Sequence, residues 1–236
     1  MQTSALPPTV DQCVGASVPK PAAASHDVLD LAPDDRRTAF VGRLEIAWDP
    51  RILEPRPWTA DQSRWAARLL TTLPPGPVLE LCSGAGHIGL LTVAGTRREL
   101  VCVDREPVAT AYAADNAARN GIGAQVHART ATIEEVAEEP TRYALVLADP
   151  PWVPSAGIDR FPEDPPGAID GGPDGTDLAV ACVRTAATVL LPGGALVLQL
   201  GTAEQATGAV AEAAAAHGLT VEEVRPCAGG VLVLLR

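Results

Sequence analysis

Short apolar runs alternate with amphipathic segments along most of this chain. The apolar runs predict strands at residues 77–82, 99–104, 124–128, 143–149 and 195–201. Helical patterns lie between or after these runs, at residues 86–93, 107–120, 132–139, 176–190 and 203–217. Strands that alternate with helices imply a parallel sheet that is covered by helices on both faces.

The carboxyl-terminal end of the chain departs from this alternation. Two further apolar runs, at residues 219–224 and 231–236, predict strands with only a short Gly-containing connection between them. Because no helix separates these two strands, one of them should run antiparallel to its neighbours. The expected fold is therefore α/β and Rossmann-like, with a doubly wound, mostly parallel seven-stranded sheet and one antiparallel strand near the C-terminus.

The amino-terminal part predicts a different arrangement. Residues 1–39 begin with a stretch rich in Pro, Ala and Ser and are expected to form an irregular arm. Residues 40–48 alternate as a strand or a hairpin, and residues 61–71 fit a helix with Thr59 as its N-cap. We expect one domain over residues 40–236.

Composition restricts the class of function. The chain has 236 residues, of which 47% are apolar but only 3% aromatic, so Ala, Val and Leu must fill the core. Its net charge of −11 argues against affinity for nucleic acid, which requires a basic surface. The five cysteines are odd in number and include no CxxC pair, so neither a metal site nor a disulfide framework is expected. Without a signal sequence or a long apolar run, the protein is expected to be cytoplasmic and not bound to a membrane.

The segment VLELCSGAGHIGL, residues 78–90, is the first that suggests chemistry. A predicted strand ends, a loop of small residues follows, and a helix begins. Gly84 and Gly86 would let the backbone approach a ligand closely, and the helix start offers free N–H groups. Asp104 ends the next predicted strand, 20 residues after Gly84, where an acid commonly accepts hydrogen bonds from ribose hydroxyls.

The segment ALVLADPPWVPS, residues 144–155, is the second. A predicted strand ends at Asp149, and two prolines and Trp152 follow. Prolines cannot continue a sheet, but they make a stiff turn that can hold carbonyl groups in place. An ordinary turn after a strand has the same local pattern. The segment therefore indicates a binding site only in combination with the glycine loop.

Read together, these segments resemble class I S-adenosylmethionine-dependent methyltransferases. ELCSGAG looks like their cofactor loop, and ADPPW looks like the N/D-P-P-Y/F/W motif of members that methylate nitrogen. A narrower resemblance is to the HemK-type release-factor glutamine N5-methyltransferases. It rests on DPRILEPRPWT (49–59) and IDGGPDGTDL (169–178), and on LLPGGALVLQLG, which follows in the same order.

The resemblance implies S-adenosyl-L-methionine as cofactor and assigns roles to particular residues. Those expected to bind the cofactor are Glu80, Cys82, Ser83, Gly84, Gly86, Ile88, Asp104, Arg105, Thr130 and Asp149. Those expected to bind the acceptor are Arg56, Trp58, Thr59, Asp149, Pro151 and Trp152, and Pro57 is expected to help cover the pocket. Asp149, Pro150 and Trp152 are expected to be catalytic, with the indole ring packed on a planar acceptor group.

The chain also departs from the family pattern. Cys82 stands where the family usually has glycine, which is tolerable if its φ is negative. Trp58 replaces the usual Glu, and the segment HARTAT (127–132) lacks the acid that commonly contacts adenine. The family's N-terminal helical domain is expected to be reduced to the arm of residues 1–39.

The nature of the acceptor stays open at this point. An ionised Asp149 only accepts hydrogen bonds, so it suits an N–H-rich or cationic nitrogen and favours a small molecule such as an amino acid, a guanidinium or a secondary metabolite. The motif order favours a protein glutamine instead, as in the family. The acidic stretch 157–174 is either a solvated loop or a lid for a cationic acceptor. An inactive cofactor-binding or regulatory subunit is a further alternative.

Overall fold

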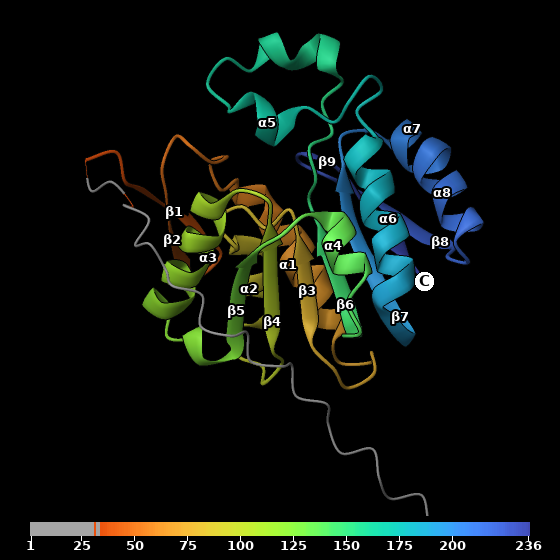
Figure 1. Ribbon diagram of the computed structural model, residues 1–236, viewed down its shortest axis with the longest axis horizontal. Helices are drawn as coiled ribbons and strands as arrows, with labels where there is room; N and C mark the ends of the chain where they lie inside the picture. The colour runs from red at the N-terminus through yellow and green to blue at the C-terminus, as the bar shows by residue number, and fades with distance from the viewer. Residues whose placement is uncertain (1–30, 32–33) are drawn as a thin grey trace, which may run out of the picture.

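The computed structural model of the protein describes residue 31 and residues 34–236 (Figure 1). The predicted arm therefore lies largely outside the described residues. The part of the arm that is described already contains β1 (Arg37–Val41), which pairs antiparallel with β2 (Leu44–Trp48). The predicted hairpin is thus present, and it begins before residue 40.

A seven-stranded sheet forms the centre of the molecule, with strand order β5-β4-β3-β6-β7-β9-β8. Its strands are β3 (Val78–Leu81), β4 (Leu100–Asp104), β5 (Val126–Thr130), β6 (Tyr143–Ala148), β7 (Leu190–Leu200), β8 (Val221–Cys227) and β9 (Gly230–Leu235). Only β9 runs antiparallel to its neighbours, β7 and β8. The predicted doubly wound, mostly parallel sheet with one antiparallel strand is confirmed.

Helices cover both faces of this sheet and bury two separate apolar layers (Figure 1). The layer that contains Trp65 and Tyr112 is covered by α1 (Ala60–Leu69), α2 (His87–Val93) and α3 (Pro107–Arg119). The opposite layer is covered by α4 (Ile133–Ala137), α6 (Asp177–Val189), the π-helical turn η4 (Ala206–Val210) that follows α7 (Ala203–Gln205), and α8 (Ala211–Ala216). Because β3, β6 and β7 are buried on both faces, their sequences are almost continuously apolar.

Two predicted elements differ from the structure at glycines. The segment Pro192-Gly193-Gly194, which predicts a turn before the strand, lies inside β7. Gly193 has a φ of +77°, and the pairing of β6 with β7 shifts register between Tyr143 and Leu145, so the strand accommodates these residues as an irregularity. The helix predicted over 203–217 is interrupted at Gly208, whose backbone angles are not helical.

A short 3-10 helix, η1 (Pro57–Thr59), precedes α1. Thr59 holds the N-cap position of α1, as predicted, but its side chain forms no capping hydrogen bond. Thr59 has helical backbone angles, and its Oγ1 donates to the carbonyl oxygen of Arg56 over 2.6 Å. The preceding 3-10 turn already places Thr59 within helical geometry, so its hydroxyl cannot reach the free N–H groups of α1.

Residues 154–175, here called the lid segment, lie above the carboxyl ends of the strands (Figure 1). The lid segment contains the 3-10 helix η3 (Ser155–Arg160) and the short helix α5 (Pro166–Ile169). Val153 forms an isolated parallel bridge with Asp170, which ties the two ends of the segment together. In the part of the chain that the structure describes, no helix is long and apolar enough to cross a lipid bilayer.

Candidate active site

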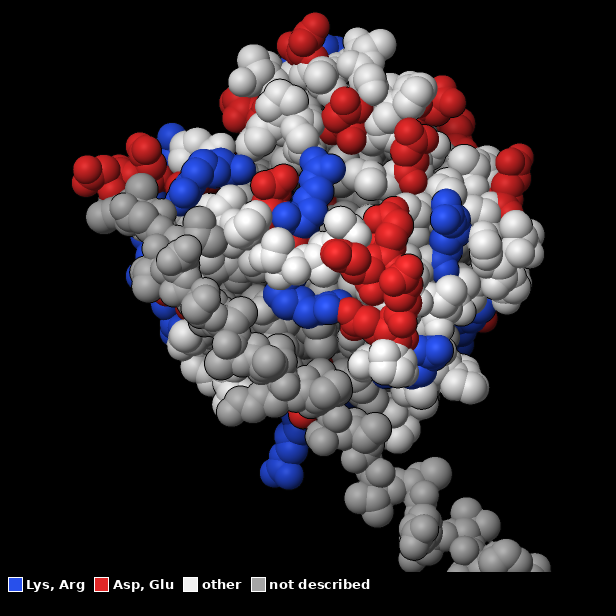
Figure 2. Space-filling model, viewed as in Figure 1, with Lys and Arg blue, Asp and Glu red and all other residues white. Residues whose placement is uncertain are grey.

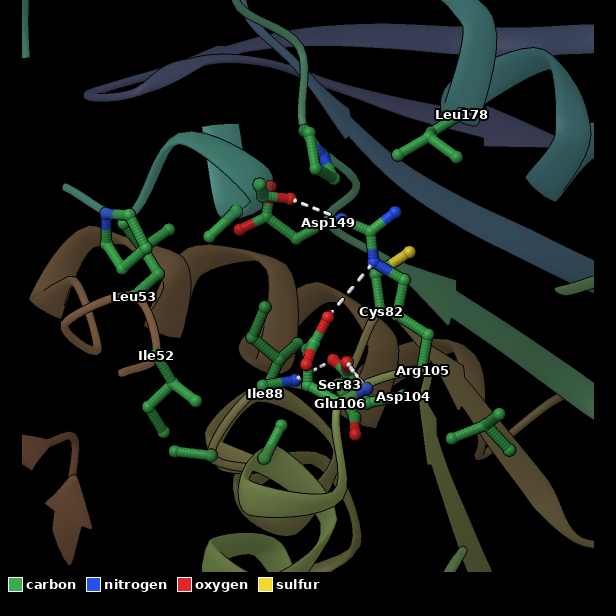
Figure 3. A pocket seen from close by; sticks show the side chains of 18 of the residues that line it. Ile52, Leu53, Cys82, Ser83, Ile88, Asp104, Arg105, Glu106, Asp149 and Leu178 are labelled. Atoms are coloured by element: carbon green, nitrogen blue, oxygen red, sulfur yellow. Dashed lines mark hydrogen bonds and ion pairs between the residues drawn. The ribbon is translucent and has the colours of Figure 1, made fainter. Parts of the chain in front are cut away.

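A cavity of about 490 Å³ opens at the carboxyl ends of β3, β4 and β6, beneath the lid segment (Figure 3). Parallel α/β sheets commonly bind ligands at this edge. The cavity is lined mainly by the loop after β3, the end of β4, residues 131–134 at the start of α4, Asp149 and Pro151 after β6, and the chain before α1 together with α5. Apolar side chains contribute to several parts of the wall, namely Ile52, Leu53, Pro165, Ala168 and Leu178.

The glycine loop shapes one wall of the cavity. A β-carbon at Gly84 would have no neighbour within 4 Å, and the φ of this residue is +50°. Its N–H donates to Oδ2 of Asp104 over 2.8 Å, which fixes the loop against β4. Gly86 has a different role, because a β-carbon there would lie 2.9 Å from Ala113 Cβ of α3. Gly84 therefore leaves space for a ligand, whereas Gly86 allows the loop to pack on the fold.

Cys82 is the one described non-glycine residue with a positive φ, +54°. The sequence analysis expected Cys82 to be tolerated in place of glycine if its φ were negative. Its φ is positive, so this condition is not met. The left-handed conformation is costly for a residue with a β-carbon and tends to occur at functional sites. Cys82 is half-buried; a hydrogen bond with the Cys182 thiol and desolvation raise the pKa of its thiol well above the ordinary value. Cys82 is thus an inert thiol on a strained backbone.

The positive φ of Cys82 should make the stability of the protein depend on which residue occupies this position. Replacement of Cys82 by valine is expected to lower the free energy of unfolding by roughly 1–3 kcal/mol, because a β-branched residue fits poorly at a positive φ. Replacement by glycine removes the strain and is expected to cost much less. Urea denaturation of the two variants measures the difference, and equal stability of Cys82→Val and Cys82→Gly would show that the position is not strained.

Asp104 connects the loop to the end of β4. Its Oδ2 accepts from Gly84 N and its Oδ1 from Glu106 N, over 2.8 and 3.0 Å. Burial raises the pKa of its carboxyl, and these two backbone N–H groups counteract that effect. The carboxyl faces the cavity, where it can accept hydrogen bonds from the hydroxyls of a ribose (Figure 3).

Glu80 lies beneath the loop and does not line the cavity wall. The residue is 2% exposed, and its Oε2 accepts from the Cys102 thiol over 3.4 Å and from the N–H of Gly89. A β-carbon at Gly89 would collide with this oxygen, so glycine is required to seat the carboxyl. Burial raises the pKa of Glu80 to about 8, and the other oxygen, Oε1, has no hydrogen-bond partner.

Asp149 follows β6 and lines the cavity. Burial raises the pKa of its carboxyl to about 7, against the effect of a hydrogen bond from the Trp152 indole. The indole lies against Gly201, where a β-carbon would collide with the ring, and it is not part of the cavity wall. The structure thus places the Trp152 side chain behind Asp149 and in contact with it, which differs from the expected stacking on an acceptor.

Two glutamines that the sequence analysis did not select hold this motif in place. Gln62 of α1 is fully buried and donates to the carbonyl oxygens of Ala148 and Val197, both over 3.0 Å. Gln205 donates to the carbonyl oxygens of Trp152 and Gly175, again over 3.0 Å. Gln205 also forms a capping box with Thr202. The T-x-x-Q spacing in the sequence is the feature from which this role of Gln205 could have been predicted.

Arginines join the lid segment to the rest of the cavity wall. Arg56 contacts both carboxylate oxygens of Asp164, over 2.6 and 2.8 Å. Arg105 donates to the carbonyl oxygen of Gly167 over 3.0 Å. Asp170 is used within the lid segment, where it accepts from Ser155 and Gly172. The lid segment is therefore held closed from two sides by ion pairing and hydrogen bonding.

Acidic side chains surround the mouth of the cavity. The exposed ones on α4 and the lid segment are Glu134, Glu135, Glu138, Asp159, Glu163 and Asp174. Figure 2 shows acidic side chains, drawn in red, gathered at the top of the molecule and on the face below it. This distribution fits a solvated acidic rim, since Asp164 and Asp170 are already engaged with other groups.

The structure brings most of the predicted site residues together around the cavity. Those in its wall are Arg56, Thr59, Cys82, Ser83, Gly84, Ile88, Asp104, Arg105, Asp149 and Pro151. Those outside its wall are Pro57, Trp58, Glu80, Gly86, Thr130, Pro150 and Trp152. Trp58 packs against Gly229, and Thr130 is hydrogen-bonded to Thr110, so neither side chain is directed at the cavity. His87 was not predicted; it lines the cavity, and burial lowers its pKa to about 4.

Among the residues that the structure describes, no three His, Cys, Asp or Glu side chains lie together in a way that could hold a metal ion.

Part of the chain is similar to known methyltransferases. The family model described as "Methyltransferase small domain" matches residues 62–161. The release factor glutamine methyltransferase of Deinococcus radiodurans is 33% identical over 166 residues, which is 67% of this chain and 58% of that protein. The protein of the same name from Mycolicibacterium smegmatis is 34% identical over 164 residues, 66% of this chain and 57% of that protein. The chain thus spans somewhat less than two thirds of the length of these relatives.

Solved structures show the same fold at much lower sequence identity. A ribosomal protein L11 methylase from Lactobacillus delbrueckii subsp. bulgaricus aligns with a TM-score of 0.59 and 12% identity, over 80% of this chain and 82% of that chain. A SAM-dependent methyltransferase from Agrobacterium tumefaciens aligns with a TM-score of 0.60 and 15% identity, over 85% of this chain and 69% of that chain.

Proposed function

The chain is a class I methyltransferase that resembles the HemK-type release factor glutamine methyltransferases, and on this premise we propose that it transfers a methyl group from S-adenosylmethionine to the side-chain nitrogen of a glutamine in a protein. The observation that carries the proposal is that Asp149 and Pro151 line the same cavity as Gly84 and Asp104. The predicted acceptor motif and the predicted cofactor loop therefore face each other.

The residues present fit this cofactor. Ser83 lines the cavity, and its Oγ is buried without a hydrogen-bond partner, so a polar group of a ligand could satisfy it. Gly84 leaves open space, and Asp104 can accept from ribose hydroxyls. Two acidic residues in the cavity wall, Asp104 and Asp149, favour a cationic ligand. When bound, S-adenosylmethionine supplies an electrophilic methyl group.

Asp149 and the prolines after it would hold the acceptor nitrogen. An amide nitrogen offers two N–H groups, and a carboxylate oxygen and a backbone carbonyl can accept one each. The turn at Pro150-Pro151 is stiff, and Gln62 and Gln205 fix its two ends, so these acceptors need little reorganisation. Asp149 can also take the proton that the nitrogen must lose once it is methylated, because its pKa of about 7 suits a general base.

The residue Asp149 by itself favoured a small-molecule acceptor. The names of the relatives favour a protein glutamine instead. The small molecule stays a second candidate, because an ionised Asp149 accepts hydrogen bonds from an amine or a guanidinium as well as from an amide. The apolar wall of Ile52, Leu53 and Pro165 suits the methylene groups of a glutamine side chain.

The Arg56–Asp164 ion pair should matter for the acceptor and not for the cofactor. Arg56→Ala is expected to raise the KM for the acceptor by about 5- to 30-fold. This range corresponds to an interaction free energy of roughly 1–2 kcal/mol for a half-buried ion pair. The Kd of the cofactor should stay within about twofold, since the pair joins the lid segment to the chain before η1. Asp164→Ala is expected to have the same effect, and the double variant no larger one. Additive effects would contradict this role.

Labelling of a cell extract tests the proposed acceptor. The protein is incubated with extract and methyl-labelled S-adenosylmethionine, and proteins are then separated from small molecules. Label in a protein that yields N-methylglutamine after digestion supports the proposal. Label in the small-molecule fraction supports the second candidate. Absence of label from both fractions, with cofactor binding intact, would favour a regulatory subunit.

A further inference from the structure

His87 lines the cavity with a ring whose polar atoms are not used by the fold. It is the first residue of α2 and is partly exposed. Both ring nitrogens are buried, and neither has a hydrogen-bond partner among the described residues. A neutral imidazole carries one N–H donor and one acceptor nitrogen. Because buried polar groups are nearly always paired, this ring is expected to bond to a group that the described chain does not supply.

Asn116 of α3 fixes the loop before His87 relative to the end of β2. Its Nδ2 donates to the carbonyl oxygens of Ala47 and Ala85, over 2.9 and 3.1 Å. Its Oδ1 accepts from the N–H of Ala47 over 2.8 Å. Because one amide nitrogen reaches both carbonyl groups, the end of β2 and the loop before α2 lie side by side. His87 follows Ala85 by two residues, so it stands next to the chain that leaves β2.

Arg51 lies on that chain and also lines the cavity. The buried carboxylate of Asp49 accepts from Arg51 Nη2 over 2.6 Å and from the Tyr112 hydroxyl over 2.7 Å. Tyr112 stands on α3 one helical turn before the bridging asparagine, and Ala109, near the start of the same helix, lines the cavity. Arg51 and His87 therefore belong to the same end of the cavity, where α3 begins.

The chemistry of this end fits one part of the cofactor. The proposed function assigns the ribose to Asp104 and the acceptor to Asp149 and Pro151, all of which line other parts of the wall. The cofactor also has an amino-acid end, which carries a carboxylate and an ammonium group and requires polar partners of its own. A carboxylate accepts hydrogen bonds from an imidazole N–H and from a guanidinium. His87 and Arg51 supply these two donors at one place.

We propose that His87, beside the Arg51 that Asp49 holds, binds the carboxylate at the amino-acid end of the cofactor. The inference rests on the proposed use of S-adenosylmethionine and deepens it by naming a residue that recognises this end of the molecule. The ring nitrogens contribute almost nothing to the exposure of His87, so other atoms of the residue face the cavity in the free protein. A half-turn about the Cβ–Cγ bond exchanges ring nitrogens with ring carbons and brings an N–H to the ligand without a shift of the backbone.

Isothermal titration calorimetry with the full chain tests the proposal through two ligands. S-adenosylhomocysteine, the demethylated product, keeps the amino-acid end, whereas methylthioadenosine has the same nucleoside and thioether but lacks that end. His87→Ala is expected to raise the Kd of S-adenosylhomocysteine by about 5- to 30-fold, the range for the loss of a hydrogen bond to a charged group. The Kd of methylthioadenosine should change by less than about twofold, because this ligand does not reach His87.

The outcomes separate the inference from the proposed function. An equal loss of affinity for both ligands overturns the inference, because His87 would then support the loop and not the amino-acid end. Unchanged affinity for both ligands overturns it as well. In both cases the proposed function stands, because the wild-type protein binds the ligands. Failure of the wild-type protein to bind either ligand overturns the proposed function too.

Further variants separate hydrogen bonding from ring shape. His87→Gln keeps a donor and an acceptor and is expected to retain most of the affinity for S-adenosylhomocysteine. His87→Phe keeps a flat ring without polar atoms and is expected to match His87→Ala. His217→Ala removes an exposed histidine at the end of α8, outside the cavity wall, and is the matched control. A folded His87→Phe protein that binds as tightly as the wild type would overturn the hydrogen-bonding role.

A decarboxylated analogue of S-adenosylhomocysteine assigns the contact to the carboxylate. This analogue keeps the ammonium group, so the wild-type protein and His87→Ala are expected to bind it with similar Kd values. A loss on His87→Ala as large as that for S-adenosylhomocysteine would overturn the assignment to the carboxylate. Circular dichroism of each variant verifies that it is folded.

Discussion

Replacement of Asp149 by alanine is expected to lower kcat for methyl transfer by about 100- to 10,000-fold, the range found for the loss of a positioned proton acceptor. Asp149 lines the cavity, is backed by Trp152, and follows a strand end that Gln62 holds by its carbonyl group. The variant loses both the acceptor of an N–H and the base that removes the proton.

Asp149→Asn separates these two functions. It keeps an oxygen that can accept an N–H but cannot take up a proton, so its kcat is expected to lie between those of the wild type and Asp149→Ala. Steady-state rates with saturating cofactor measure the effect, and Asp159→Asn is the control for the loss of an acidic side chain. A kcat of Asp149→Ala within about threefold of the wild type would contradict the assignment of this residue.

Replacement of Asp104 by alanine is expected to raise the Kd of the cofactor by about 10- to 100-fold. The variant removes an acceptor for ribose hydroxyls and leaves two backbone N–H groups, Gly84 N and Glu106 N, without their partner. Hydrogen bonds to a charged acceptor contribute roughly 1.5–3 kcal/mol, which corresponds to this change in Kd.

Asp104→Asn keeps one carbonyl oxygen and is expected to have a smaller effect on the same Kd. Calorimetric titration of both variants with S-adenosylhomocysteine avoids the contribution of the sulfonium charge. Thermal unfolding without ligand shows whether the loop after β3 has lost stability. An unchanged Kd in a folded Asp104→Ala protein would indicate that the ribose is not bound here.

The sequence predicted the sheet and most of its helices because their patterns are local. Buried strands such as β6 are continuous apolar runs, and a helix such as α3 is marked by Pro107 at its start and Gly121 after its end. Where a glycine permits more than one conformation, the prediction differs from the structure, as at Gly193 inside β7 and Gly208 within the last helix.

The site was predictable only as far as its motifs extend. The glycine loop, Asp104 and Asp149 stand at strand ends, where a parallel sheet brings them together. The contacts of Gln62 and the Arg56–Asp164 pair could not be predicted in this way. Gln62 contacts a residue 86 positions away, and Arg56 and Asp164 are 108 positions apart, so no local pattern marks these contacts. The direction of the Trp152 ring was also not predictable. The ring packs against Gly201, which follows β7 and has no side chain in its way.

The most direct test of the account is to map the product of the reaction. A purified release factor is incubated with the protein and S-adenosylmethionine, digested, and examined by peptide mass spectrometry, in parallel with the Asp149→Ala variant. The account predicts a single methyl group on a glutamine side chain, present with the wild-type protein and absent with the variant. Methylation at an oxygen, or an equal yield with both proteins, would contradict nitrogen transfer at the Asp149 site.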